Sequence, residues 1–160
     1  MLDLPARHEK LKADFHKLEV QQIRESRMER FLWKYSDQTY SLLRIVAGFL
    51  LFCHGAQKIL GLFGGVGRDG GTVEFASQAG VAGSIELTGG LAILLGIGTS
   101  WAAFLSSGLM AFAYFLAHQP RGPLPIQNRG ELAALYAFLF LYIASKGSGI
   151  WSLETVLRKR

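Results

Sequence analysis

Four long apolar runs dominate this chain, and each one carries or adjoins a polar group that is costly inside a lipid bilayer. The runs are residues 42–62, 81–97, 101–117 and 132–145. A transmembrane helix needs about 20 mostly apolar residues, within a range of about 17–25. The first three runs have this length, and the fourth approaches it when Gly130 and Lys146 lie at the interfaces. The runs therefore predict an all-α fold, a four-transmembrane-helix bundle.

A soluble four-helix bundle is the alternative fold, and it would need a charged face on every helix. Residues 80–118 contain one acidic residue, Glu86, and one histidine at the very end, His118. The second and third runs therefore lack the charged faces that water would require, and the composition favours a membrane.

The polar residues are concentrated before the first run, where residues 1–40 contain eight Lys or Arg and seven Asp or Glu. This asymmetry predicts a cytoplasmic helical arm at 1–40, a transmembrane domain at 41–148 and a basic tail at 149–160. Apolar residues of the arm recur on one helical face: Leu4, Leu11, Phe15 and Leu18. Such an amphipathic extension is expected to lie on the inner membrane surface or to dock on a partner.

The basic residues also predict the orientation in the membrane. Eight Lys or Arg precede the first run and four follow the last, whereas the opposite loops contain Arg68, Arg121 and Arg129. Because basic residues concentrate in cytoplasmic loops, we expect both termini in the cytoplasm and the protein in the plasma (inner) membrane. The net charge of +5 is explained by these flanks and does not indicate nucleic-acid binding. Arg44, near the inner surface, is expected to be an interface anchor.

The first run has no cleavable signal pattern before it, so we expect it to direct its own insertion. Small residues in the second run are expected to let helices approach closely; these are Gly89, Gly90, Gly96 and Gly98. The single cysteine, Cys53, excludes an internal disulfide and a cysteine-ligated cluster. A haem b held by His54 and His118 is an alternative, but their depths differ by about 7 Å, and no metal site is predicted.

The polar groups of separate runs fall at one predicted depth. At a rise of about 1.5 Å per residue, His54 lies about 18 Å and Lys58 about 24 Å from the inner edge. Glu86, on the returning helix, lies about 22 Å from that edge, and His118 about 25 Å. Four segments that are distant in sequence are thus expected to bring polar side chains together in the outer third of the membrane.

Energetics favours such clustering, because a charged residue at the centre of a membrane helix costs roughly 2.5–3.5 kcal/mol on insertion scales. We therefore predict a Lys58–Glu86 ion pair beside a small cavity that opens outward. The full predicted cluster comprises His54, Gln57, Lys58, Glu86, His118, Asn128 and Glu131. Plain structural explanations also stand, since Lys58 can snorkel to the headgroups and Glu86 can simply tie two helices.

Five segments resemble the DoxX family of small four-helix membrane proteins. They are LLRIVAGFLLFCHGAQKILGLFGG (42–65), AGSIELTGGLAILLGIGT (82–99), AYFLAHQPRG (113–122), NRGELAALYAFLFLYIA (128–144) and GSGIWSLE (147–154). The resemblance covers residues 41–156, roughly, and leaves the arm unexplained. It implies a link to membrane oxidoreductases, notably an archaeal thiosulfate:quinone oxidoreductase, and to redox-stress complexes.

By that resemblance, His54, Lys58, Glu86 and Glu131 would contact a quinone ring oxygen or a small anion, and a carboxylate would pass protons. No cofactor is expected to reside in the chain, so electrons would come from another bound substrate or from a soluble or membrane redox partner. The expected role is a subunit or relative of a quinone-linked oxidoreductase. The alternatives are a non-catalytic scaffold that recruits a soluble partner through the arm, and a small-ligand permease, which would need a homo-oligomer.

Overall fold

The computed structural model describes residues 7–12, 27–67 and 69–158. Within this part the chain is helical and contains no strand, as an all-α fold predicts. It forms two compact units, one ending at Ser36 and the other running from Asp37 to Arg160. Each unit is described separately below.

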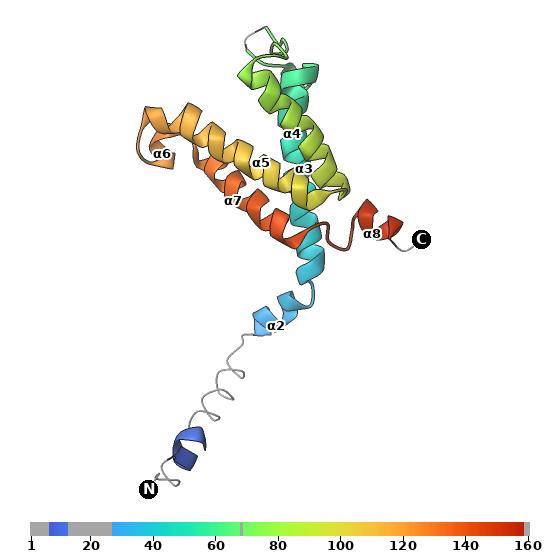
Figure 1. Cartoon of the computed structure of the whole chain (residues 1–160), viewed down its shortest axis with the longest axis vertical. Helices are drawn as coiled ribbons and strands as arrows, with labels where there is room; N and C mark the ends of the chain where they lie inside the picture. Colours follow the sequence, from blue (N-terminus) through green and yellow to red (C-terminus); the bar gives the residue numbers. More distant parts are fainter. Residues whose placement is uncertain (1–6, 13–26, 68, 159–160) are drawn as a thin grey trace. The chain divides into compact units, whose positions relative to one another are not determined.

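The elements follow one another as successive helices (Figure 1). The α-helices are α2 (Arg27–Trp33), α3 (Ser36–Leu60), α4 (Gln78–Leu95), α5 (Thr99–Ala113), α6 (Pro125–Asn128), α7 (Glu131–Lys146) and α8 (Leu153–Leu157). Short helical turns of other types are η1 (Leu62–Gly64), η2 (Tyr114–His118) and η3 (Gln119–Arg121).

Three helices of the described part are long and apolar enough to cross a membrane: α3, α4, and α5 with its continuation to Arg121. The first three predicted spans are therefore present as helices of membrane length. The fourth, α7, has 16 residues and measures about 24 Å, less than the roughly 30 Å of a hydrocarbon core. That α7 also crosses the membrane stays a prediction.

Glycines bring α3 and α4 into direct backbone contact. Gly48 and Gly55 on α3 face Gly90 and Gly83 on the antiparallel α4. A Cβ atom added at Gly55 would lie 2.2 Å from the backbone nitrogen of Leu87, closer than any real contact. Only a residue without a side chain fits there, and the two helices consequently pack as a rigid pair.

Two of the glycines that the sequence led us to expect at close helix contacts, Gly96 and Gly98, instead lie in a turn. Gly96 and Gly98 have φ angles of 72° and 55° and form the turn between α4 and α5. Gly96 ends α4 in the left-handed conformation that favours glycine, and Gly98 precedes α5 in the same conformation. Both glycines reverse the chain, and Gly96 also lets the segment before α8 approach, because a Cβ there would lie 2.3 Å from that of Ser152.

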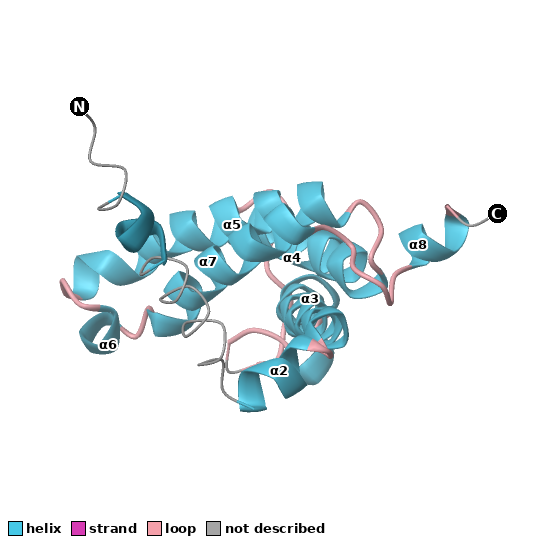
Figure 2. Cartoon of the chain, turned by 90° about the horizontal axis from the view of Figure 1, so that it is seen from below, coloured by secondary structure: helices cyan, strands magenta, loops and turns pink. Residues whose placement is uncertain are grey.

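A second pair is formed by α5 and α7, which run side by side in Figure 1 and obliquely to α3 and α4. In Figure 2, which looks nearly along α3, these two helices are seen from the side. The Ser107 hydroxyl donates to the Ala137 carbonyl at 2.7 Å and ties α5 to α7. Fully buried Leu51, Ile93 and Phe140 fill the space where the two pairs meet.

Arg44 is not the interface anchor that the sequence suggested, because it is fully buried. Its guanidinium donates to the carbonyls of Ile93, at 2.5 Å, and Leu94, at 2.9 Å, in the last turn of α4. It also donates to the Trp151 carbonyl in the segment before α8. The last carbonyls of a helix carry partial negative charge and have no partner within the helix. Arg44 therefore caps α4 and fastens the tail to it.

The tail folds against the start of α5. Gly98 at the N-cap of α5 has no side chain to cap the helix, and the Glu154 carboxylate fills this role by accepting from the Gly98 N–H. It also accepts from the Ser148 hydroxyl at 2.5 Å and pairs with Arg158 at 2.6 Å. The Ser148 hydrogen bond above all, together with Arg158 and Gly98, lowers the pKa of Glu154 against the opposing effect of burial.

In the first unit, α2 exposes a group of large apolar side chains. These are Met28, Phe31, Leu32 and Trp33. Phe31 and Tyr35 make an edge-to-face ring contact. Of the apolar stripe predicted further upstream, Leu11 is described and exposed, whereas Leu4, Phe15 and Leu18 lie outside the described residues.

We predict that Gly55→Ala lowers the free energy of unfolding by about 1–3 kcal/mol, because α3 and α4 must separate to admit the methyl group. The matched control is Gly108→Ala on α5, where an added Cβ meets nothing within 4 Å. It should leave stability unchanged or raise it by up to about 1 kcal/mol. Unfolding of the purified protein in detergent, followed by tryptophan fluorescence, measures both. Equal effects at the two positions would contradict the close packing.

We predict that acid releases the tail through Glu154. Because the folded-state pKa lies below the unfolded value of about 4.3, the stabilisation is complete above that pH and is lost as the pH falls through the folded pKa. Trp151 fluorescence, in a background carrying Trp33→Phe and Trp101→Phe, should report this transition. Glu154→Gln keeps the acceptor oxygen but has no proton to gain, so its signal should be flat over the same range.

Candidate functional site

Lys58 and Glu86 form the ion pair that the sequence predicted. The Lys58 Nζ lies 2.6 Å from Oε1 and 2.7 Å from Oε2 of Glu86, so it binds both carboxylate oxygens. Glu86 is 4% exposed, and the Lys58 side chain keeps 28% of its surface accessible. Gly83, one turn before Glu86, makes room for the pair, because a Cβ there would lie 2.9 Å from that of Lys58.

The pair opens on a cavity of about 250 Å³ between α3, α4, α5 and α7. Polar and titratable side chains line one part of it: His54, Lys58, Glu86, His118, Arg129 and Tyr136. Leu51, Met110 and Leu132 are among the apolar residues that complete the wall. The cavity, called the polar cavity below, thus has both hydrogen-bonding and apolar lining residues.

His118 is delivered to the polar cavity by an irregular helix end. After Ala113 the chain widens into the π-helical turn Tyr114–His118 and then tightens into η3. Such π turns are rare and are often found at functional sites. The His118 Nδ1 lies 3.2 Å from the backbone oxygen of Asn128. Because a carbonyl can only accept, Nδ1 carries the proton in this contact, and Nε2 is the nitrogen left for a ligand.

Arg129 and Tyr136 line the cavity although neither belongs to the cluster predicted from the sequence. The sequence indicated Arg129 only as a basic residue of the loop before the fourth apolar run. Its backbone is left-handed, with φ of 60°, a conformation that costs a residue with a side chain roughly 1–2 kcal/mol. Strained residues of this kind cluster at functional sites. No carboxylate of the described residues lies within ion-pair distance of Arg129. In the sequence Arg129 stands in the run Asn128-Arg129-Gly130 just before α7, and this run does not specify a left-handed backbone.

Three of the seven predicted site residues do not line the polar cavity. Gln57 is half-buried on α3, beside Lys58. Asn128 is 1% exposed and organises the loop: it donates to the Gly122 carbonyl at 2.9 Å and accepts from the Gly130 N–H at 2.8 Å. Glu131 is exposed in the first turn of α7, where a carboxylate suits the positive end of the helix dipole.

The charges of the cavity favour a ligand with acceptor oxygens. Glu86 is paired with Lys58, and Arg129 adds a positive charge that no carboxylate of the described residues pairs. His54 and His118 add imidazole nitrogens, which can donate or accept hydrogen bonds. The arrangement can therefore donate hydrogen bonds to an oxygen and exchange protons with it. Among the described residues, no three His, Cys, Asp or Glu side chains gather as they would around a metal ion.

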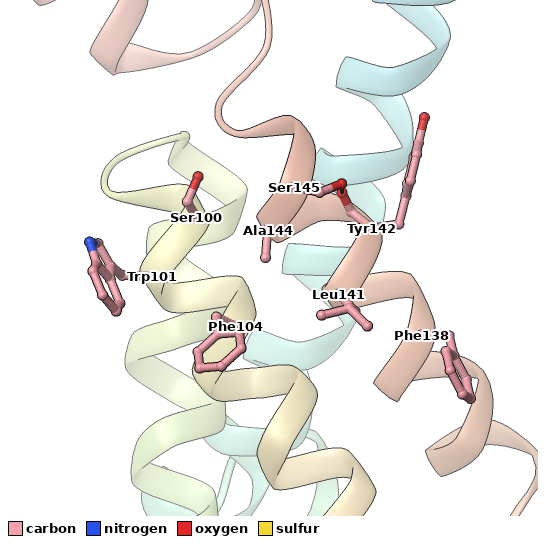
Figure 3. Close-up of a pocket in the computed structure, with 8 residues that line it drawn as sticks. All are labelled: Ser100, Trp101, Phe104, Phe138, Leu141, Tyr142, Ala144 and Ser145. Carbon is pink, nitrogen blue, oxygen red and sulfur yellow. Dashed lines mark hydrogen bonds between the residues drawn. The ribbon is translucent and has the colours of Figure 1, made fainter.

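Two larger grooves lie between helices and are almost wholly apolar. One, of about 820 Å³, runs between α5 and α7. Figure 3 shows Trp101 and Phe104 of α5 lining it together with Phe138 and Leu141 of α7. The other, of about 630 Å³, runs between α4 and α5. We call them the α5–α7 groove and the α4–α5 groove. Surfaces of this kind suit hydrocarbon chains and offer no chemistry of their own.

Comparison with known proteins gives a family and one relative. The DoxX family model matches residues 39–119, half of the chain. An uncharacterized protein of Haemophilus influenzae is 39% identical over 136 residues, covering 81% of this chain and 98% of that protein. No solved structure matches the chain. The family match includes His54, Lys58 and Glu86 and ends just after His118, so Arg129 lies beyond it.

We predict that Lys58→Met lowers the free energy of unfolding by on the order of 3 kcal/mol, because it leaves the Glu86 carboxylate buried without a partner. Glu86→Gln should cost less, since the partly exposed lysine can reach the interface. The double variant should cost less than the sum, by about 1–3 kcal/mol. Lys146→Met, at an exposed lysine, is the control. Strict additivity in a detergent unfolding assay would show that the two residues are not coupled.

Proposed function

The chain belongs to the DoxX family of membrane proteins, and we propose that it is the membrane subunit of a quinone-linked oxidoreductase whose polar cavity binds the quinone ring. One observation carries the proposal: a buried Lys58–Glu86 pair opens on a cavity that two histidines and Arg129 also line. Ionisable groups at membrane depth are costly, and their convergence on one cavity is best explained by a ligand.

The ring of a quinone suits both the polar and the apolar lining residues of the polar cavity. Its two oxygens accept hydrogen bonds, and the cavity offers donors on Lys58, Arg129 and the histidines. Its apolar ring face suits the side formed by residues such as Leu51 and Met110. A planar ring with oxygens at opposite ends therefore satisfies the donors without burying them unpaired.

Proton transfer is the chemistry that the chain itself would supply. Reduction of a quinone to a quinol adds two electrons and two protons, the electrons coming from a soluble or membrane redox partner. His54 and His118 would donate the protons as general acids, the role for which proteins use histidine most often. Lys58, held by both oxygens of Glu86, would polarise a ring oxygen and stabilise negative charge that develops on it.

For the membrane placement, we propose that α7 joins the three long helices as a fourth crossing, in the plasma (inner) membrane, with both termini cytoplasmic. An even number of crossings returns the chain to the side on which it started. In support, the start of α3 and the end of α7 lie at the same end of the second unit, where the Tyr40 hydroxyl donates to the Gly147 carbonyl at 2.5 Å. The basic residues before and after the helices favour the cytoplasm for that end.

A non-catalytic scaffold is the second candidate, and α2 is the observation that favours it. Phe31 is 60% exposed and Trp33 is 82% exposed. Large aromatic side chains exposed together at a surface often mark a docking site. In this role the first unit would recruit a soluble partner, and the polar cavity would only stabilise the helices. The redox role requires the cavity residues for turnover, whereas the scaffold role does not.

We predict that Lys58→Met, Glu86→Gln and Arg129→Gln each lower kcat/KM for reduction of a quinone analogue by about a hundredfold. The assay uses the complex purified natively with its redox partner, and Lys146→Met serves as the control with unchanged turnover. Binding of a tailless dimethoxy-methyl benzoquinone to the chain alone should weaken in parallel. Full activity of all three cavity variants, with the partner still bound, would replace the redox role by the scaffold role.

A further inference from the structure

The polar cavity and the α4–α5 groove lie on either side of the same helix pair. On α4, Glu86 lines the cavity and its neighbour Ile85 lines the groove. On α5, Met110 lines the cavity and Leu109 lines the groove. Ala113 lines both spaces. The polar cavity and the groove are therefore neighbours across α4 and α5, and Ala113 is the residue that they share.

Small residues line part of the α4–α5 groove and leave space between α4 and α5. These are Ala76, Ala79, Ala82, Gly108, Ala113 and Ala117. The groove has a volume of about 630 Å³ and follows α4 from Gln78 to Ile85, about 11 Å at 1.5 Å per residue. Larger apolar side chains, such as Phe112 and Leu116, form its rim. This shape suits one flexible hydrocarbon chain.

We propose that the ligand of the polar cavity is an amphiphile, with its ring in the cavity and an apolar tail that passes Ala113 into the α4–α5 groove. This inference rests on the proposed function and adds the class of molecule and its tail site. The α5–α7 groove is larger, but none of its lining residues also lines the polar cavity. Continuity at Ala113 therefore selects the smaller groove as the tail site.

The geometry also sets the route by which such a ligand arrives. A molecule with a long apolar tail is dissolved in the bilayer, so it reaches the cavity sideways from lipid. The gap between α4 and α5 is the lateral opening that adjoins the polar cavity at Ala113. Short polar molecules need no such opening, and filling the groove should leave their binding intact.

The test compares a tailless dimethoxy-methyl benzoquinone with the same ring carrying a decyl tail, both bound to the full chain in detergent. Gly108→Phe fills the groove away from the polar cavity, at a position where an added Cβ meets nothing within 4 Å. It should weaken binding of the tailed probe on the order of tenfold and leave the tailless probe unaffected. The matched control is Ala144→Phe in the α5–α7 groove, which should change neither.

A second measurement uses the unaltered protein and does not depend on the variant folding. A diazirine at the end of the decyl tail is photoactivated, and labelled peptides are identified by mass spectrometry. We expect labels on α4–α5 groove residues such as Val81, Leu105 and Phe112. Labels on Phe104 or Phe138 in the other groove would overturn the tail site.

The outcomes separate this inference from the function on which it rests. If the tailless ring binds and the tail adds no affinity, or Gly108→Phe affects both probes equally, the tail site is wrong and the ring site stands. If neither probe binds the unaltered chain, the ring site and the tail site both fail.

Discussion

The backbone contact between α3 and α4 sets the position of the polar groups. At Gly55 the backbones of the two helices meet, and at Gly83 the α4 backbone lies against the side chains of Lys58 and Ile59 on α3. At this separation the Lys58 ammonium on α3 reaches both carboxylate oxygens of Glu86 on α4 directly. Were the helices further apart, the same two residues would each face lipid or need water, at a cost of a few kcal/mol.

Irregular backbone brings the remaining donors to that pair. The π turn at the end of α5 carries His118, and a left-handed residue between α6 and α7 carries Arg129. Asn128 holds this loop with side-chain hydrogen bonds to Gly122 and Gly130. The left-handed conformation of Arg129 also ends α6, as its C-cap, whereas the π turn continues the helical chain beyond α5. The π turn and the left-handed residue each supply a side chain to the polar cavity. Unusual backbone conformations of this kind are common at binding sites.

Depth along a helix was enough to predict part of the site. Counting 1.5 Å per residue placed Lys58 and Glu86 at one level, and their contact follows. His54 and His118 were placed by the same count and line the same cavity. Arg129 escaped because its position depends on a backbone angle that no residue pattern near it specifies. Helix periodicity predicts how deep a residue lies in the membrane and on which face of its helix. The conformation of a loop depends on contacts made elsewhere in the fold.

Two cations of α3, the fully buried Arg44 and the partly exposed Lys58, show why burial alone does not identify a site. Arg44 is wholly enclosed, and its guanidinium is used by carbonyls at the end of α4 and before α8. It has no cavity beside it within the described residues, and removing it would undo a cap. Lys58 is paired with a carboxylate and keeps surface open to a cavity. Because the Lys58 ammonium is accessible from the cavity, it can redirect a hydrogen bond from Glu86 to a ligand. The enclosed guanidinium of Arg44 cannot reach a ligand.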